Sequence, residues 1–154
     1  MKTFWNGITN YAFYCNKFAE TFHFYGDVLE LEHLFTRRDD AGQAIQSVFK
    51  VGEKQFIVLN NKAHEGAMFW ENLSCTHIAI EVNDIFAVAR MLEGKGVMLT
   101  KGPRADHRMQ ALPYSIDPEI APCGSYTAWL RDPEGNEMEL MQYTDASMQH
   151  CCGE

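Results

Sequence analysis

The chain lacks a disulfide framework among its cysteines and a hydrophobic segment long enough to cross a membrane. Its 154 residues include five cysteines, an odd number without the spacing of a disulfide framework, which is typical of proteins in a reducing cytoplasm. No apolar run approaches the roughly 20 residues that a membrane-spanning helix needs, and the start of the chain lacks a signal-peptide pattern. We therefore expect a cytoplasmic protein with no membrane partner.

Positive charge is also scarce. Lysine and arginine number 13 against 21 aspartates and glutamates, for a formal net charge of -8. Because nucleic acids and anionic membranes bind basic surfaces, this balance argues against both as partners. The hydrophobic content of 46% and the charged content of 22% are ordinary for a globular protein. The length of 154 residues suits one domain, or two very small ones that share a core.

Hydrophobic periodicity predicts a β-α-β-β-β order in the first half of the chain. Residues 8–15 have the composition of a strand, and Asn16 is the expected N-cap of the helix that follows. Aromatic residues recur at helical spacing at Phe18, Phe22 and Tyr25, so this helix has a wide apolar face. Further strands are expected at residues 31–38, 43–51 and 55–60.

The second half repeats this order. Residues 77–82 are predicted to form a strand, and Asn83 is expected to cap a helix that ends near Gly94 and Gly96. A long loop with several prolines follows at residues 102–123. The remaining strands are expected at residues 97–100, 124–130 and 136–143.

The two halves predict one α+β domain made of two β-α-β-β-β repeats, residues 8–62 and 75–143, which form a curved mixed sheet around one cleft. The connector at 63–74 carries Phe69 and Trp70. It is too apolar for a free linker, so we expect it to pack, at a homodimer interface. Residues 146–154 are expected to be a flexible tail that exposes Cys151 and Cys152.

The stretch D-P-E-G-N-E-M-E-L at residues 132–140 carries the strongest local signal. Asp132 can bond the amides of its own turn, proline fixes φ at the next position, and Gly135 tolerates a positive φ. In the strand that follows, Met138 and Leu140 point to one face and Glu139 to the other. A carboxylate at mid-strand is either solvated or placed in a pocket.

Aligning the two halves identifies four positions that share one environment. Asn10 lies over His77 with an offset of 67 residues, and Val58 lies over Glu139 with an offset of 81. The longer loop at 102–123 accounts for the difference. If the repeats are related by a pseudo-twofold axis, all four residues face the shared cleft.

Several side chains near this cleft have either a functional or an ordinary structural role. Without a metal, Glu139 beside His77 is a candidate general base whose pKa depends on burial. Tyr14 and Tyr126 are candidates to line the pocket, although aromatic residues on strands are more often core. Arg104 and His107 belong either to a solvated loop or to a lid that presents cations to an anionic substrate. His64 is either an ordinary loop histidine or a further ligand supplied from the connector.

Three stretches together resemble the vicinal oxygen chelate superfamily, which includes glyoxalase I, extradiol dioxygenases and bleomycin-resistance proteins. They are D-P-E-G-N-E-M-E-L, T-H-I-A-I-E-V-N-D at residues 76–84, and F-Y-G-D-V-L-E-L at residues 24–31. The resemblance implies that His77 and Glu139 are metal ligands. It also implies that Asn10 and Val58 stand where metal-dependent members carry two further ligands.

This resemblance implies two functions. The first is a glyoxalase-like lyase or isomerase in which a divalent metal (Zn, Ni, Fe, Co or Mn), held by His77, Glu139 and a weaker ligand at Asn10, chelates adjacent oxygens of a small substrate. The second is a metal-free homodimer of the bleomycin-resistance type that sequesters a small molecule. Asn10 and Val58 favour the second; His77 and Glu139 favour the first.

Overall fold

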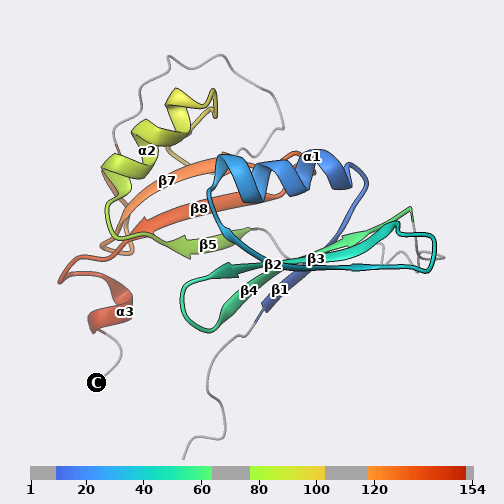
Figure 1. The fold of residues 1–154 in the computed structure, drawn as a ribbon. Helices are drawn as coiled ribbons and strands as arrows, with labels where there is room; N and C mark the ends of the chain where they lie inside the picture. Colours follow the sequence, from blue (N-terminus) through green and yellow to red (C-terminus); the bar gives the residue numbers. More distant parts are fainter. Residues whose placement is uncertain (1–9, 64–76, 103–117, 152–154) are drawn as a thin grey trace, which may run out of the picture. The chain divides into compact units, whose positions relative to one another are not determined.

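The computed structural model describes residues 10–63, 77–102 and 118–151. The chain divides into two compact units, Met1–Leu73 and Ser74–Glu154, each with one four-stranded mixed sheet (Figure 1). The predicted fold class, α+β with two β-α-β-β-β repeats, is confirmed, since the structure has two four-stranded mixed sheets with few helices. No helix among the described residues is long and apolar enough to span a membrane.

The first unit follows the predicted β-α-β-β-β order. Its sheet has the order β1-β4-β3-β2, in which β1 runs parallel to β4 and the other neighbours are antiparallel. The elements are β1 (Asn10–Cys15), α1 (Phe18–His23), the π-helical turn η1 (Phe24–Val28), β2 (Glu32–Arg38), β3 (Ala44–Val51) and β4 (Gln55–Asn61).

The helical segment of this unit covers one face of its sheet. Phe49, Ile57 and Leu59 are buried on that face, and the rings of Phe22 and Tyr25 contact Phe49 at centroid distances of 5.2 and 6.3 Å. Because side chains alternate along a strand, the intervening residues face the other side. The aromatic periodicity of the sequence therefore marked the core correctly.

The start of α1 differs from the prediction. Lys17, and not Asn16, is the N-cap residue, and no side chain accepts a capping hydrogen bond. The Asn16 side-chain oxygen instead accepts a hydrogen bond of 2.9 Å from the Lys62 ammonium group. This bond joins the residues that follow β1 and β4, so Asn16 links the ends of two parallel strands.

The second unit has the same strand order, β5-β8-β7-β6, with β5 parallel to β8. The strand predicted at 97–100 is wrong, because Thr100 forms only an isolated bridge with Trp129 and a two-residue strand takes the edge position. The elements are β5 (Ile78–Glu81), α2 (Ile85–Gly94), β6 (Glu119–Ile120), β7 (Tyr126–Arg131), β8 (Glu137–Gln142) and α3 (Met148–Cys151).

Helix α2 lies beside β7 and covers one face of this sheet (Figure 1). Its N-cap is Asp84 rather than the predicted Asn83, and the Asp84 carboxylate accepts a hydrogen bond of 3.0 Å from the Ala87 amide. At its C-terminus Gly96 has a φ of 80°, and the Val97 amide donates to the Leu92 carbonyl at 2.9 Å. This is a Schellman motif, so the glycine signal in the sequence was sound.

The expected tail begins with residues that contact the sheet. Ser147 is fully buried, its hydroxyl lies 2.8 Å from that of Ser125, and the Met148 amide donates to the Cys123 carbonyl at 3.0 Å. Gly124 has a φ of 82° and lies so close to the Ala146 carbonyl that a Cβ atom would overlap it. The flexibility of the tail stays a prediction, but its first residues are held against the start of β7.

Candidate functional site

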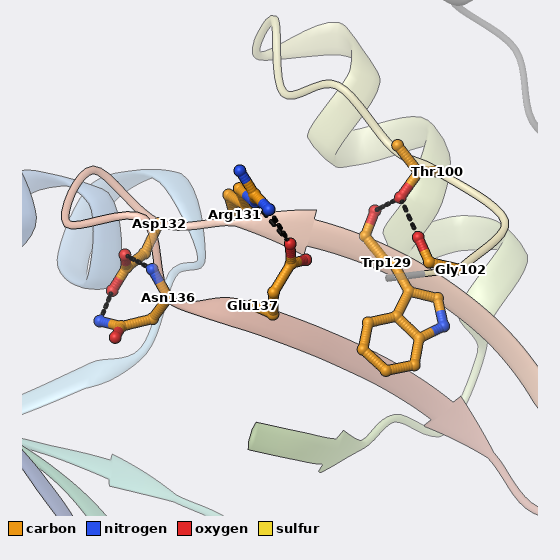
Figure 2. Close-up of polar contacts among 7 residues, drawn as sticks. All are labelled: Thr100, Gly102, Trp129, Arg131, Asp132, Asn136 and Glu137. Carbon is orange, nitrogen blue, oxygen red and sulfur yellow. Dashed lines mark hydrogen bonds and ion pairs between the residues drawn. The ribbon is translucent and has the colours of Figure 1, made fainter. Parts of the chain in front are cut away.

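The turn before β8 fixes where Glu139 lies. The Asp132 carboxylate is buried and accepts three hydrogen bonds, from the amides of Glu134 and Asn136 at 2.9 and 2.8 Å and from the Asn136 side chain at 2.8 Å (Figure 2). Gly135 completes the turn with a φ of 89°. The predicted turn is confirmed, and it sets the β7–β8 register that aligns Glu139 with Trp129.

Alternation along β8 then separates two environments. Met138 and Leu140 are buried on the face that α2 covers, at 0% and 3% exposure. Glu139 lies on the opposite face, with Ala79 of β5 and Trp129 of β7 as its neighbours in register. This opposite face of the second unit, centred on Glu139, is called the open face below because α2 does not cover it; Trp129 on this face is nevertheless buried, at 7% exposure.

His77 and Glu139 come together on the open face. His77 Nε2 lies 3.5 Å from Glu139 Oε2, and the His77 ring meets the Trp129 ring edge-on at a centroid distance of 4.9 Å. The side chain of Glu139 is 12% exposed and that of His77 is 37% exposed. The carboxylate is therefore the more buried of the two groups, and the imidazole is nearer to solvent.

Burial and His77 act in opposite directions on the Glu139 carboxyl. Loss of solvent raises the pKa of Glu139, and the nearby His77 lowers it by a smaller amount. A carboxyl group with a raised pKa stays protonated to a higher pH than an exposed one does. It can donate a hydrogen bond to a ligand when protonated and act as a general base when ionised.

Two further polar contacts support the open face. Arg131 and Glu137 form an ion pair between β7 and β8 (Figure 2). Arg131 lies two residues after Trp129 on β7, and Glu137 lies two residues before Glu139 on β8. On the other side of β7, the backbone amide and carbonyl of Trp129 bond to those of Thr100, at 2.9 and 2.8 Å. Trp129 is thus held between β8 and the segment at Thr100, which fixes the wall of the site.

Sequence reasoning missed Trp129 and chose Tyr126 instead. The Tyr126 ring contacts Phe86 of α2 at a centroid distance of 5.4 Å, so it lies on the covered face and not beside Glu139. The sequence repeat could have identified Trp129. The offset of 81 that relates Val58 to Glu139 also relates Val48 to Trp129, and Val48 is the neighbour of Val58 in register.

The other predicted residues lie in the first unit or outside the described residues. Asn10 and Tyr14 are exposed on β1, and Val58 lies between Ala12 and Val48 on the face that α1 does not cover. That these residues share a cleft with His77 and Glu139 stays a prediction. Three candidates lie outside the described residues: His64, Arg104 and His107.

A metal would find only two strong ligands here. His77 and Glu139 are chemically suited to a divalent ion, but a catalytic site usually takes about three protein ligands. Within residues 10–63, 77–102 and 118–151, no cluster of three or more His, Cys, Asp or Glu side chains could hold a metal ion. The donor set that the structure describes therefore does not fit a complete metal centre.

Similar folds occur in proteins with different roles. A lactoylglutathione lyase from Agrobacterium tumefaciens is 21% identical, with 91% of this chain and 96% of that chain covered and a TM-score of 0.62. The antibiotic-binding protein TnmS3 from Streptomyces sp. CB03234 is 15% identical, with 93% and 100% covered and a TM-score of 0.66. At this level of identity the likeness shows the fold alone.

Sequence comparison places the chain in a family. No curated protein matches it significantly. The profile of the glyoxalase/bleomycin resistance protein/dioxygenase superfamily matches residues 7–140, a span that holds β1 to β7, the Asp132 turn and both His77 and Glu139. The chain belongs to the glyoxalase/bleomycin resistance protein/dioxygenase superfamily.

Proposed function

We propose that the open face of the second unit binds a small molecule without a catalytic metal, in the manner of the antibiotic-binding members of the superfamily. The observation that carries this proposal is the grouping of Glu139, His77 and Trp129, a part-buried carboxyl and imidazole against an aromatic ring. An apolar wall with a few polar groups is the usual composition of a ligand site. The ligand stacks on Trp129 and exchanges hydrogen bonds with Glu139 and His77.

This proposal is tested with a fragment library divided into carboxylates, amines and neutral aromatic compounds, screened by saturation-transfer NMR. Fragments that bind the wild type should lose binding to Trp129→Leu and Glu139→Gln. Glu53→Gln is the matched control, since it makes the same chemical change on an exposed turn residue. Fragments that bind all four proteins equally well would contradict the proposal.

The second candidate is the metal-dependent lyase or isomerase. It is favoured by the 3.5 Å separation of His77 Nε2 and Glu139 Oε2, since two ligands of one ion lie at about this distance. Its test is the metal content of untagged protein purified without chelator. About one Zn, Ni, Fe, Co or Mn ion per chain, lost in His77→Ala and bound more tightly in Asn10→His, would favour this enzyme over the binding protein.

We also propose a cytoplasmic homodimer. Cys15 and Cys123 are both free thiols, in keeping with a reducing compartment. The connector from which the dimer was predicted lies almost wholly outside the described residues. Its part in the contact between the two copies therefore stays a prediction, and the described residues offer a second candidate surface.

A further inference from the structure

The outer strand of the first unit's sheet is long and exposed. β2 spans Glu32–Arg38 and pairs with β3 on one side; among the described residues no strand lies on its other side. Six of its seven residues are exposed, and only Thr36 is half-buried. The row of backbone amides and carbonyls on this outer side is a template for another strand.

Large apolar side chains project from this edge. Phe35 is 52% exposed and Leu34 is 41% exposed. Soluble proteins usually protect such an edge with charges, bulges, prolines or a short strand. β2 is long and has no proline, and although it has a bulge, its charged residues include both signs, so they can pair with those of a second copy. Exposed apolar residues on an unpaired edge indicate a surface that is covered in the working form of the protein.

Two of the three charged residues on β2, Glu32 and Arg37, lie symmetrically about Phe35; the third, Arg38, donates a hydrogen bond of 2.9 Å to the Gly42 carbonyl. In register with β3, Glu32 pairs with Lys50, Phe35 with Val48, and Arg37 with Gln46. Because these three β3 residues alternate along one strand, Glu32, Phe35 and Arg37 lie on one face at equal steps. A bulge at Leu34 absorbs the extra residue between Glu32 and Phe35 and so produces this symmetry.

We propose that a second copy of this chain pairs its β2 with this one, antiparallel, about a twofold axis that passes through Phe35. The pairing places Phe35 against Phe35 of the second copy. It also places Glu32 against Arg37 of the second copy, twice, because an isologous interface repeats every contact. Cross-strand pairs of opposite charge stabilise an antiparallel sheet, whereas like charges oppose it.

The existing contacts of these residues leave this pairing open. The Glu32 carboxylate lies 3.9 Å from the Lys50 ammonium group, and its side chain is 66% exposed. So long and exposed an ion pair contributes little to stability, and Glu32 can turn toward a second strand without a large loss. This interface gives the proposed dimer a location, and it does not depend on ligand binding at the open face.

The test is sedimentation equilibrium of the full chain across a range of concentrations. Glu32→Arg and Arg37→Glu each replace two attractive pairs by two repulsive ones, so each should weaken the dimer by roughly tenfold or more. An equimolar mixture of the two variants should recover the wild-type affinity, since the arginine introduced in one chain then opposes the glutamate introduced in the other. Phe35→Thr, which keeps a good strand former, should also weaken the dimer.

Glu53→Arg and Lys54→Glu are the matched controls, because they make the same kinds of charge change on the exposed turn between β3 and β4. Thermal melts establish that every variant folds. A wild type that is monomeric at all concentrations would overturn the proposal. So would a dimer that Glu32→Arg and Arg37→Glu leave unchanged, or a mixture of the two that stays monomeric.

Discussion

The sheet of the first unit ends on β2, which has seven residues, whereas the sheet of the second unit ends on β6, which has two. Their inner strands match closely. Ala12 pairs with Val58 in the first unit as Ala79 pairs with Glu139 in the second, at the offsets of 67 and 81 that the sequence repeat predicts. The two units thus share their inner register and differ at the edge.

The difference extends to the side chains of one cross-strand row. The first unit has an apolar row made of Ala12, Val58 and Val48. At the corresponding positions the second unit has Ala79, Glu139 and Trp129. The same scaffold therefore carries an apolar row in one unit and a row with a carboxyl group and an indole in the other, while the first unit keeps the edge proposed to pair with another chain.

The largest expected effect on the free energy of unfolding comes from replacing a glycine that only the second unit requires. Gly124→Ala should lower the free energy of unfolding by roughly 3 kcal/mol or more, because φ is positive and a Cβ would overlap the Ala146 carbonyl. Gly42→Ala in the first unit has the same sign of φ but open space around it. It should cost about 1 kcal/mol. Equal losses in urea denaturation would show that the Ala146 contact is unimportant.

A smaller difference is expected between two aspartate turns. Asp132→Ala should cost about 2–3 kcal/mol, because the three groups that donate to the buried carboxylate would lose their acceptor. Asp39→Ala in the first unit should cost about 1 kcal/mol, since Asp39 accepts a bond of 2.7 Å from the Gln43 amide on an exposed turn. Denaturant midpoints measure both, and a reversed order would contradict the account of how β8 is positioned.

The smallest expected effect is on the pH dependence of stability. Burial raises the pKa of Glu139 in the folded chain. Its contribution to stability is therefore fully present below its unfolded-state pKa and is lost as the pH rises through the folded-state pKa. Glu139→Gln removes this loss, so the variant should gain stability relative to wild type on going from about pH 4 to about pH 7.

Thermal melts across that range measure the effect. Glu53→Gln is the control, since it makes the same chemical change on an exposed turn residue. If Glu139→Gln instead loses stability relative to wild type toward neutral pH, the attraction between Glu139 and His77 outweighs the cost of burial. The site would then be built around an ion pair.

Much of the fold could be predicted because the local signals were redundant. Apolar alternation, helical spacing and the Asp132 turn each indicated the same elements, and the repeat checked them. The errors fell where neighbouring residues compete for one role. Asn83 and Asp84 are both good capping residues, and it is the Asp84 carboxylate that accepts a hydrogen bond from the Ala87 amide.

The site was predicted less completely because it depends on register. His77 and Glu139 follow from motifs within single strands. Trp129 follows only once the β7–β8 pairing is known, since a shift of one residue would put Tyr126 on the open face instead. The wrong prediction of a strand at 97–100 has a similar cause. Thr100 pairs with Trp129 through one isolated bridge, and such tertiary contacts at a sheet edge cannot be predicted from composition.

The central claim is that ligands bind on the open face beside Trp129. It is tested most directly by following the indole N–H signals of the three tryptophans in amide-correlation NMR spectra, with Trp129→Phe used to assign the Trp129 signal. Adding a fragment from the screen should shift the Trp129 signal in a saturable way in wild type and Glu53→Gln, and not in Glu139→Gln. Fragments that bind with the same affinity to wild type and Glu139→Gln and leave the Trp129 signal in place would contradict the claim.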